Sequence, residues 1–252
     1  KCLYPADLVF INNDPLTYKN LNNQGRPVYE LKTNEEAGDF SNLVRFIRVL
    51  NNTSAAAFPD SIESLLDVPG TLQYFAMNIL TGRWDDYWSQ MNNYYLYHNP
   101  SENKFQVIPY DYDNSFGVDW FNINWANANP YSFPKVASGY RPLAERLMSN
   151  NQYRDLYTHF LSFYRTNVTS LPLWEARLDS LKNMIAPAAI PDTFRTLDYG
   201  FSVNDFFDSY SASGYQNQHV KFGLKQFVNQ RNQSIQSQLN YVNASPIAYD
   251  IK

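Results

Sequence analysis

Polar side chains gather in the middle of the sequence, within a span short enough to serve one reaction. They are the loop Arg83-Trp84-Asp85-Asp86, the pair Asn92-Asn93, and the carboxylates Asp111 and Asp113. Carboxylate and amide oxygens are hard ligands of the kind that Mg²⁺ binds, usually one or two per ion, with phosphate and water completing the shell. A further carboxylate upstream can act as a base or position a hydroxyl nucleophile. These groups are therefore candidates for metal-dependent phosphoryl transfer.

The order of the groups narrows the chemistry, although the residue types alone leave a structural role equally open. A loop Asp, then an Asn, then an Asp a few residues before Phe116-Gly117 parallels the order of catalytic and metal-binding residues in protein kinases. Asp and Asn also favour turns, because their short side chains bond the nearby backbone. A glycosidase with Asp85 and Asp111 as paired carboxylates is another interpretation, but it leaves Asn93 unexplained.

A β-hairpin would bring these groups together, and the sequence predicts one. Two apolar runs, residues 94–97 and 105–108, are separated by residues 98–103, which are dense in turn formers. In an antiparallel hairpin the start of one strand lies beside the end of the other. Asn93 is therefore expected to lie near Asp111.

Helical patterns flank the hairpin on both sides. From Ser41, apolar residues recur at helical spacing as far as Asn51-Asn52, and a second helix runs from about Pro69 to Leu80, with Gly82 just past its end. Further helices are predicted over Pro142 to Met148, Tyr153 to Arg165, Leu173 to Ile185 and His219 to Tyr241, after a loop at residues 119–139. We therefore expect one α+β domain over residues 1–252, mainly a helical lobe with a small β-hairpin that carries the site.

Three segments of the sequence together resemble the spore-coat CotH kinase family. They are Leu80-Thr81-Gly82-Arg83-Trp84-Asp85-Asp86-Tyr87-Trp88, Asn92-Asn93-Tyr94-Tyr95-Leu96-Tyr97 and Ile108-Pro109-Tyr110-Asp111-Tyr112-Asp113-Asn114-Ser115-Phe116-Gly117. Supporting matches are Tyr4-Pro5-Ala6-Asp7-Leu8, Tyr29-Glu30-Leu31-Lys32-Thr33-Asn34 and Arg141-Pro142-Leu143. The resemblance extends over residues 1–170, and residues 171–252 are expected to form a variable helical end.

The resemblance implies an atypical protein-kinase-like fold that uses ATP and Mg²⁺ or Mn²⁺ to phosphorylate Ser or Thr of a protein substrate. It implies the catalytic role for Asp85, metal ligation by Asn93 and Asp111, and a supporting metal ligand in Asp113. The doublet with Asp86 leaves the choice of base open, with Asp85 preferred. Family habit suggests a bacterial extracellular or cell-surface protein.

A kinase also needs an upstream lobe that covers the nucleotide phosphates and supplies a Lys. Before Asp85 the sequence has no Gly-rich loop, and Lys32 is the one Lys with a strand-like setting. We therefore expect the chain to be the C-terminal portion of a kinase, with phosphate transfer that is poor in isolation. The alternative from another class is a catalytically inactive, pseudokinase-like binding or surface-assembly module.

Composition excludes some partners and leaves others open. The formal net charge is −4 and Lys and Arg do not cluster, so a nucleic-acid partner is not expected. No apolar run is long enough to cross a membrane, so no membrane span is expected. Aromatic residues make up 17% of the chain, a content found in carbohydrate and peptide binders, but core packing is favoured, for Trp84 and Trp88 in particular.

Overall fold

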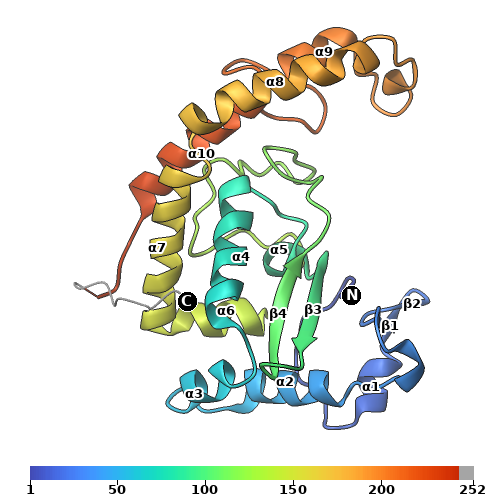
Figure 1. Cartoon of the computed structure of the whole chain (residues 1–252), viewed down its shortest axis with the longest axis vertical. Coiled ribbons are helices and arrows are strands. Elements are labelled where there is room, and N and C mark those ends of the chain that lie inside the picture. The colour runs from blue at the N-terminus through green and yellow to red at the C-terminus, as the bar shows by residue number, and fades with distance from the viewer. Residues whose placement is uncertain (244–252) are drawn as a thin grey trace.

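The computed structural model describes residues 1–243, and within them the chain has an α+β architecture. The first half contains α1 (Pro15–Lys19), β1 (Asn22–Asn23), β2 (Arg26–Pro27), the 3₁₀ helix η1 (Glu35–Ala37), α2 (Ser41–Asn52), α3 (Phe58–Glu63), α4 (Val68–Thr81), α5 (Tyr87–Gln90), β3 (Tyr94–Asn99) and β4 (Lys104–Pro109). The second half contains α6 (Pro142–Ser149), α7 (Asn151–Asn167), α8 (Leu171–Ala189), the 3₁₀ helix η2 (Phe194–Thr196), α9 (Val203–Asp208) and α10 (Leu224–Gln238). The α+β class is thus confirmed (Figure 1).

Helix α4 lies at the centre of the molecule, packed between α7 and the β3–β4 hairpin (Figure 1). Its start is set by Asp67, whose carboxylate accepts from the Gly70 amide at 3.0 Å, and by Pro69 in the first turn. Its end is set by Gly82, which adopts the left-handed conformation at φ 63°. Most of the helix is buried, so it can hold a following loop in a fixed position.

The predicted helix from Ser41 is also confirmed as α2, which ends at Asn52. Ser41 is the first helical residue, and its amide donates to the Asp39 carboxylate at 2.8 Å. Its buried face includes Phe46, whose ring centroid lies 5.1 Å from that of Phe105 in β4. The helix therefore contacts the hairpin near its turn, where Phe105 pairs with His98.

The predicted hairpin is confirmed as an antiparallel pair of β3 and β4. Its register pairs Tyr94 with Pro109 at one end and Asn99 with Lys104 at the other. Cys2, near the N-terminus, bridges to Tyr94 at the open end of the hairpin. The segment before β3 therefore lies beside the segment after β4, as the sequence predicts.

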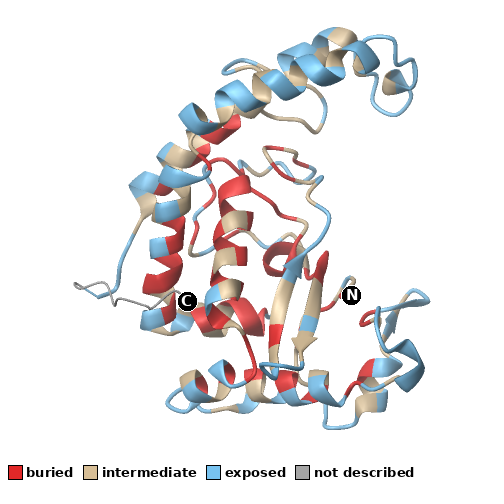
Figure 2. Cartoon of the chain, viewed as in Figure 1, coloured by how far each residue is buried: buried red, intermediate tan, exposed pale blue. Residues whose placement is uncertain are grey.

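Helices α8 and α9 project from the body at the top of Figure 1, and Figure 2 shows how little of them is buried. All nineteen residues of α8 are described, and none of them is buried. Large apolar side chains such as Met184 and Phe194 are exposed by 68% and 76%. None of the helices within residues 1–243 is long and apolar enough to cross a membrane.

The last predicted helix is shorter than the sequence suggests, because α10 begins at Leu224 and not at His219. Residues 217–220 instead form a turn that bridges to Val118, and the His219 carbonyl accepts from the Asp119 amide at 2.7 Å. Gly223 follows in an extended conformation and caps α10. A contact with the loop after the hairpin thus replaces the first helical turns.

Candidate active site

Asp85 lies in the loop that follows α4, where its half-buried carboxylate accepts three side-chain amides. Asn93 donates to Oδ2 at 2.8 Å, Asn92 donates to Oδ1 at 3.1 Å, and Asn114 donates to Oδ2 at 3.4 Å. The donors come from both ends of the hairpin. The carboxylate is therefore held where residues before β3 and residues after β4 meet.

Arg83 is the side chain that joins these two ends from inside. It is fully buried, and its Nη2 donates to the Asn93 carbonyl at 2.7 Å and to the Tyr110 carbonyl. Its guanidinium also lies over the Tyr112 ring, 4.1 Å from the centroid. A buried guanidinium can make several bonds in a fixed plane. Arg83 therefore fixes the spacing between the Asn93 segment and the Asp111 segment.

Asp86, the second member of the doublet, has a structural role. Its side chain is fully buried, accepts from Asn78 Nδ2 at 2.7 Å, and accepts from the Ser89 amide at 2.9 Å as the N-cap of α5. These bonds hold the short helix that precedes Asn92 and Asn93. Asp85 is the more exposed of the two, so the geometry supports the preference for Asp85 as the catalytic candidate.

Burial raises the pKa of the Asp85 carboxyl above its ordinary value, although hydrogen bonds from Asn92 and Asn114 oppose the rise. The Arg83 charge also opposes it, whereas the negative charge of Asp113 adds to it. A carboxylate whose pKa moves upward toward the working pH becomes a better proton acceptor. The environment of Asp85 is therefore suited to a base that contacts a hydroxyl.

Asp111 and Asp113 both lie in the exposed loop after β4. Asp111 adopts φ 63°, which is uncommon for a residue with a side chain and marks a constrained turn. Within residues 1–243 neither carboxylate has a hydrogen bond or ion pair with the protein. Asp113 is close enough to Asp85 for its charge to act on that carboxyl, and the residue before Asp111 is bonded to Arg83.

The donor set can be tested against a divalent metal by its chemistry. Among the described residues no three His, Cys, Asp or Glu side chains gather as a ready-made metal site. Mg²⁺ does not require such a cluster, because one or two carboxylates with substrate phosphates and water suffice. The two free carboxylates, Asp111 and Asp113, beside the Asn93 amide fit that open kind of site.

Several residues of the site were not nominated from the sequence. Asn78 is the centre of a second network, since its Oδ1 accepts from the Tyr112 hydroxyl at 2.6 Å while its amide bonds Asp86. A polar residue within the apolar run of α4 was the available signal. Asn114 had no distinguishing pattern, and its role depends on how the loop folds back.

The remaining sequence expectations around the site concern aromatic and basic residues. Trp84 and Trp88 are both buried, which confirms the packing interpretation, and the Trp84 indole donates to the Val118 carbonyl at 2.9 Å. Lys32 lies outside the strands and forms an ion pair with Glu30 at 2.7 Å, with both side chains well exposed.

The sequence is similar to those of known proteins. The family model described as CotH kinase protein matches residues 3–235. The inner spore coat protein H of Bacillus subtilis is 25% identical over 170 residues, which are 68% of this chain and 44% of that protein. The spore coat protein homolog 1 of Rhizopus delemar is 23% identical over 199 residues, 75% of this chain and 32% of that protein.

A third similar protein is invasin CotH2 of Rhizopus delemar, 34% identical over 70 residues, which are 27% of this chain and 11% of the invasin. The chain thus spans less than half the length of each of these relatives. The match to the family model continues past residue 170, so it includes α8, α9 and most of α10.

Proposed function

The chain belongs to the CotH kinase protein family, and we propose that it transfers a phosphoryl group from ATP to Ser or Thr hydroxyls of a protein, with Mg²⁺ or Mn²⁺. We further propose that its fold is protein-kinase-like. The observation that carries the proposal is the Asp85 carboxylate, which is held by Asn92 and Asn93 at the open end of the hairpin, next to the Asp111–Asp113 loop.

Residues of this chain would have separate roles in the phosphoryl transfer. Asp85 orients the acceptor hydroxyl and takes its proton as the oxygen attacks the γ-phosphorus, and the bond from that phosphorus to ADP breaks. Arg83 keeps the two ends of the hairpin at a fixed separation, so Asp85 and the Asp111 segment meet the substrate together. This positioning matters because phosphoryl transfer depends mainly on alignment and charge stabilisation.

Asn93, Asp111 and Asp113 are the residues that would hold the metal ion. A bound divalent cation would neutralise charge on the phosphate oxygens and keep the transferred group in line. The free carboxylates of Asp111 and Asp113 support this assignment. Asn93 already donates to Asp85, and its amide oxygen is the atom that would face the cation.

The names of the relatives support a surface setting. Two of them are named as spore coat proteins and one as an invasin, in a bacterium and a fungus. We propose on this basis that the present chain acts at a cell or spore surface, in an extracellular setting, and that its protein substrates lie there.

A second candidate is a catalytically inactive surface-assembly module that keeps the same scaffold. The observation in its favour is the projecting pair α8 and α9, which exposes apolar side chains without any buried residue in α8, a helix that the structure describes in full. Exposed apolar patches of this kind often mark contact surfaces. The two candidates differ in whether ATP binds and whether Asp85 matters.

The deciding experiment is calorimetric titration of ATP, with and without Mg²⁺ or Mn²⁺, into this chain. We expect metal-dependent binding that Asp111→Ala abolishes. Asp85→Asn should keep binding but lower the rate of phosphate transfer by about 10²- to 10⁴-fold, because the proton acceptor is lost.

The matched control for charge removal is Glu102→Gln, at the exposed far end of the same hairpin. It should leave both binding and transfer unchanged. Metal-independent ATP binding, or binding that Asp111→Ala leaves intact, would contradict the proposed site. An absence of ATP binding would favour the assembly module.

A further inference from the structure

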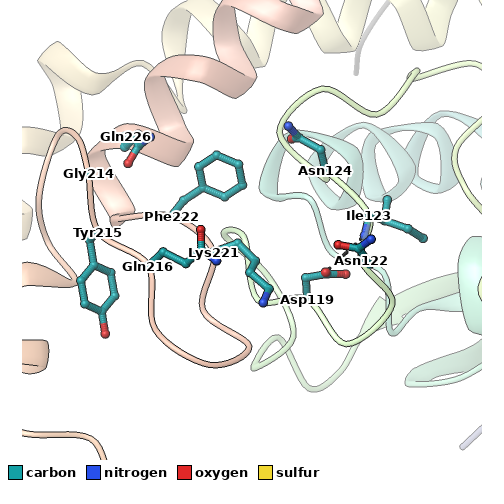
Figure 3. A pocket seen from close by; sticks show the side chains of 10 residues that line it. All are labelled: Asp119, Asn122, Ile123, Asn124, Gly214, Tyr215, Gln216, Lys221, Phe222 and Gln226. Atoms are coloured by element: carbon teal, nitrogen blue, oxygen red, sulfur yellow. Dashed lines mark hydrogen bonds between the residues drawn. The ribbon is translucent and has the colours of Figure 1, made fainter.

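A second candidate site lies beside the loop that follows the hairpin, and we call it the amide groove. It consists of two adjoining cavities of about 440 and 340 Å³, which share Asp119, Asn122 and Lys221. Figure 3 shows the larger cavity, with residues 119–124 on one side and residues 214–226 on the other. Volumes in this range are typical of small-molecule sites.

The two sides of the groove are joined by backbone hydrogen bonds. The Asp119 amide donates to the His219 carbonyl at 2.7 Å, and the Lys221 amide donates to the Gly117 carbonyl at 3.1 Å. Val118 and Val220 form an antiparallel bridge between the same segments. The groove is thus formed by paired backbone, and a ligand would not have to assemble it.

The charged groups in the groove are already engaged. The Asp119 carboxylate accepts from the Phe121 and Ile123 amides at 3.1 and 3.2 Å and from the Trp125 indole at 2.9 Å. The Lys221 ammonium donates to the Gln218 carbonyl at 2.6 Å. Among the described lining residues these are the two charged side chains, and their formal charges cancel. The groove is therefore unsuited to a polyanion or a strongly basic peptide.

Four of the five amide side chains that line the groove are free, whereas Asn124 accepts from the Asn127 backbone amide at 3.2 Å. The protein offers no hydrogen-bond partner within residues 1–243 to the side chains of Asn122, Gln216, Gln218 and Gln226, although the Gln226 Oε1 atom is itself buried. Each carboxamide has two donor hydrogens and an acceptor oxygen. Four of them together present donors and acceptors without charge, which suits the hydroxyls of a neutral, polyhydroxylated ligand.

An aromatic platform completes the groove. Trp120 leaves 48% of its surface exposed and stacks on His219, with ring centroids 4.1 Å apart and planes at 15°. Tyr199 lies against the same pair, 5.6 Å from the Trp120 centroid. The face of an aromatic ring is electron-rich and attracts weakly positive C–H groups. A pyranose ring offers C–H groups on its faces and hydroxyls around its edge.

We propose that the amide groove binds a neutral saccharide. Free carboxamides would bond its hydroxyls, and the Trp120 platform would pack against a sugar ring. The opposite formal charges of Asp119 and Lys221 would give no net attraction to a charged ligand. A purely apolar ligand would leave the four carboxamides buried without partners, which is unfavourable.

The groove lies next to the candidate active site without sharing its carboxylates. The Trp120 indole donates to Asn114 Oδ1 at 3.3 Å, and Asn114 in turn donates to Asp85. A saccharide bound there would place a glycan-bearing partner beside Asp85. Saccharide binding needs neither ATP nor metal, so it can be tested independently of the proposed kinase activity.

The test is calorimetric titration of the chain with cellohexaose, maltohexaose and N-acetylchitohexaose, without nucleotide or metal. We expect at least one of the three to bind, with a change in tryptophan fluorescence. Trp120→Ala and Gln218→Ala should each weaken that binding about tenfold or more, as for other side chains central to a binding site.

Matched controls are Phe194→Ala, an exposed ring outside the groove, and Gln233→Ala, an exposed carboxamide on α10. Both should bind as the unmodified chain does, and circular dichroism should show all four variants folded. An uncharged Gly-Ser repeat peptide of about twelve residues tests the other class of ligand. Failure of all three saccharides to bind would overturn the inference. So would a result in which only the affinity for the peptide is lowered by Trp120→Ala and Gln218→Ala.

Discussion

The surroundings of Asp85 and the amide groove differ in how they hold carboxamide side chains. Around Asp85 the amides of Asn92 and Asn93 and the guanidinium of Arg83 are bonded within the protein. In the groove, residues such as Gln216 and Gln218 have no such partner among the described residues. Chemistry needs groups held in one geometry, whereas recognition needs groups left available to a ligand. The difference therefore separates a site built to position from a site built to bind.

The two regions also differ in how far the secondary-structure elements that carry them are buried. The loop of Asp85 follows α4, most of which is buried. The groove is completed by loops of an outer segment, residues 171–222, whose main helix α8 has no buried residue along its described length. We call the rest of the described chain the body, and most of the folding free energy should therefore come from its contacts. Changes in the outer segment should affect binding more than stability.

The largest effect is expected from Arg83→Met, which removes the buried charge that faces Asp86 and joins the ends of the hairpin. Loss of one partner from a buried charged network costs about 3–5 kcal/mol. Urea denaturation should therefore show a large fall in the free energy of unfolding.

The matched variant is Arg195→Met in the outer segment, where the guanidinium bonds only the Ala189 carbonyl among the described residues. It should cost under about 1 kcal/mol, as for most changes near the surface. Equal losses from the two variants would contradict the division between body and outer segment.

A smaller difference of the same kind is expected for apolar side chains. Ile79→Ala, in the buried face of α4, should lower the free energy of unfolding by about 2–5 kcal/mol, because it leaves a cavity. Leu181→Ala, in α8 and 40% exposed, should cost under about 1 kcal/mol. The two midpoints in urea check this directly, and a larger loss from Leu181→Ala would show that α8 is packed against something in solution.

The sequence predicted the elements that depend on local patterns. The limits of α4 follow from Pro69 and Gly82, and the hairpin follows from two apolar runs around a turn. The contact between the Asn93 segment and the Asp111 segment then follows from antiparallel geometry. These features need no knowledge of distant residues, which is why the core of the site could be proposed in advance.

The features that could not be predicted depend on contacts between distant segments. Asp85 and Asp86 are chemically identical, and only the bonds from Asn78 and Ser89 show which of them is buried as a cap. The sequence pattern predicts the start of α10 too early, at His219, because the bridge from Val220 to Val118 competes with helix formation. The amide groove arises from that same bridge, so sequence patterns gave no sign of it.

The smallest expected effects are changes in stability with pH, and these changes have opposite directions in the two regions. Burial raises the pKa of Asp86, so its contribution to stability is full below the ordinary Asp value and is lost as the pH rises through the raised pKa. Hydrogen bonds from Ser202 lower the pKa of Asp205, in α9, to about 2. Its contribution is therefore present above the ordinary value and is lost as the pH falls toward 2.

Asp86→Asn and Asp205→Asn should consequently show opposite pH trends in urea denaturation between pH 2.5 and 6. The Asp205 variant should be less stable than the unmodified chain at pH 6, and the gap should close as the pH falls, since the protonated carboxyl no longer benefits from the capping box of α9. The Asp86 variant should gain stability relative to the unmodified chain as the pH rises, because the buried negative charge is absent. Parallel trends would mean that the two carboxyls share one kind of environment, which would contradict the contrast between a buried positioning network and an exposed outer segment.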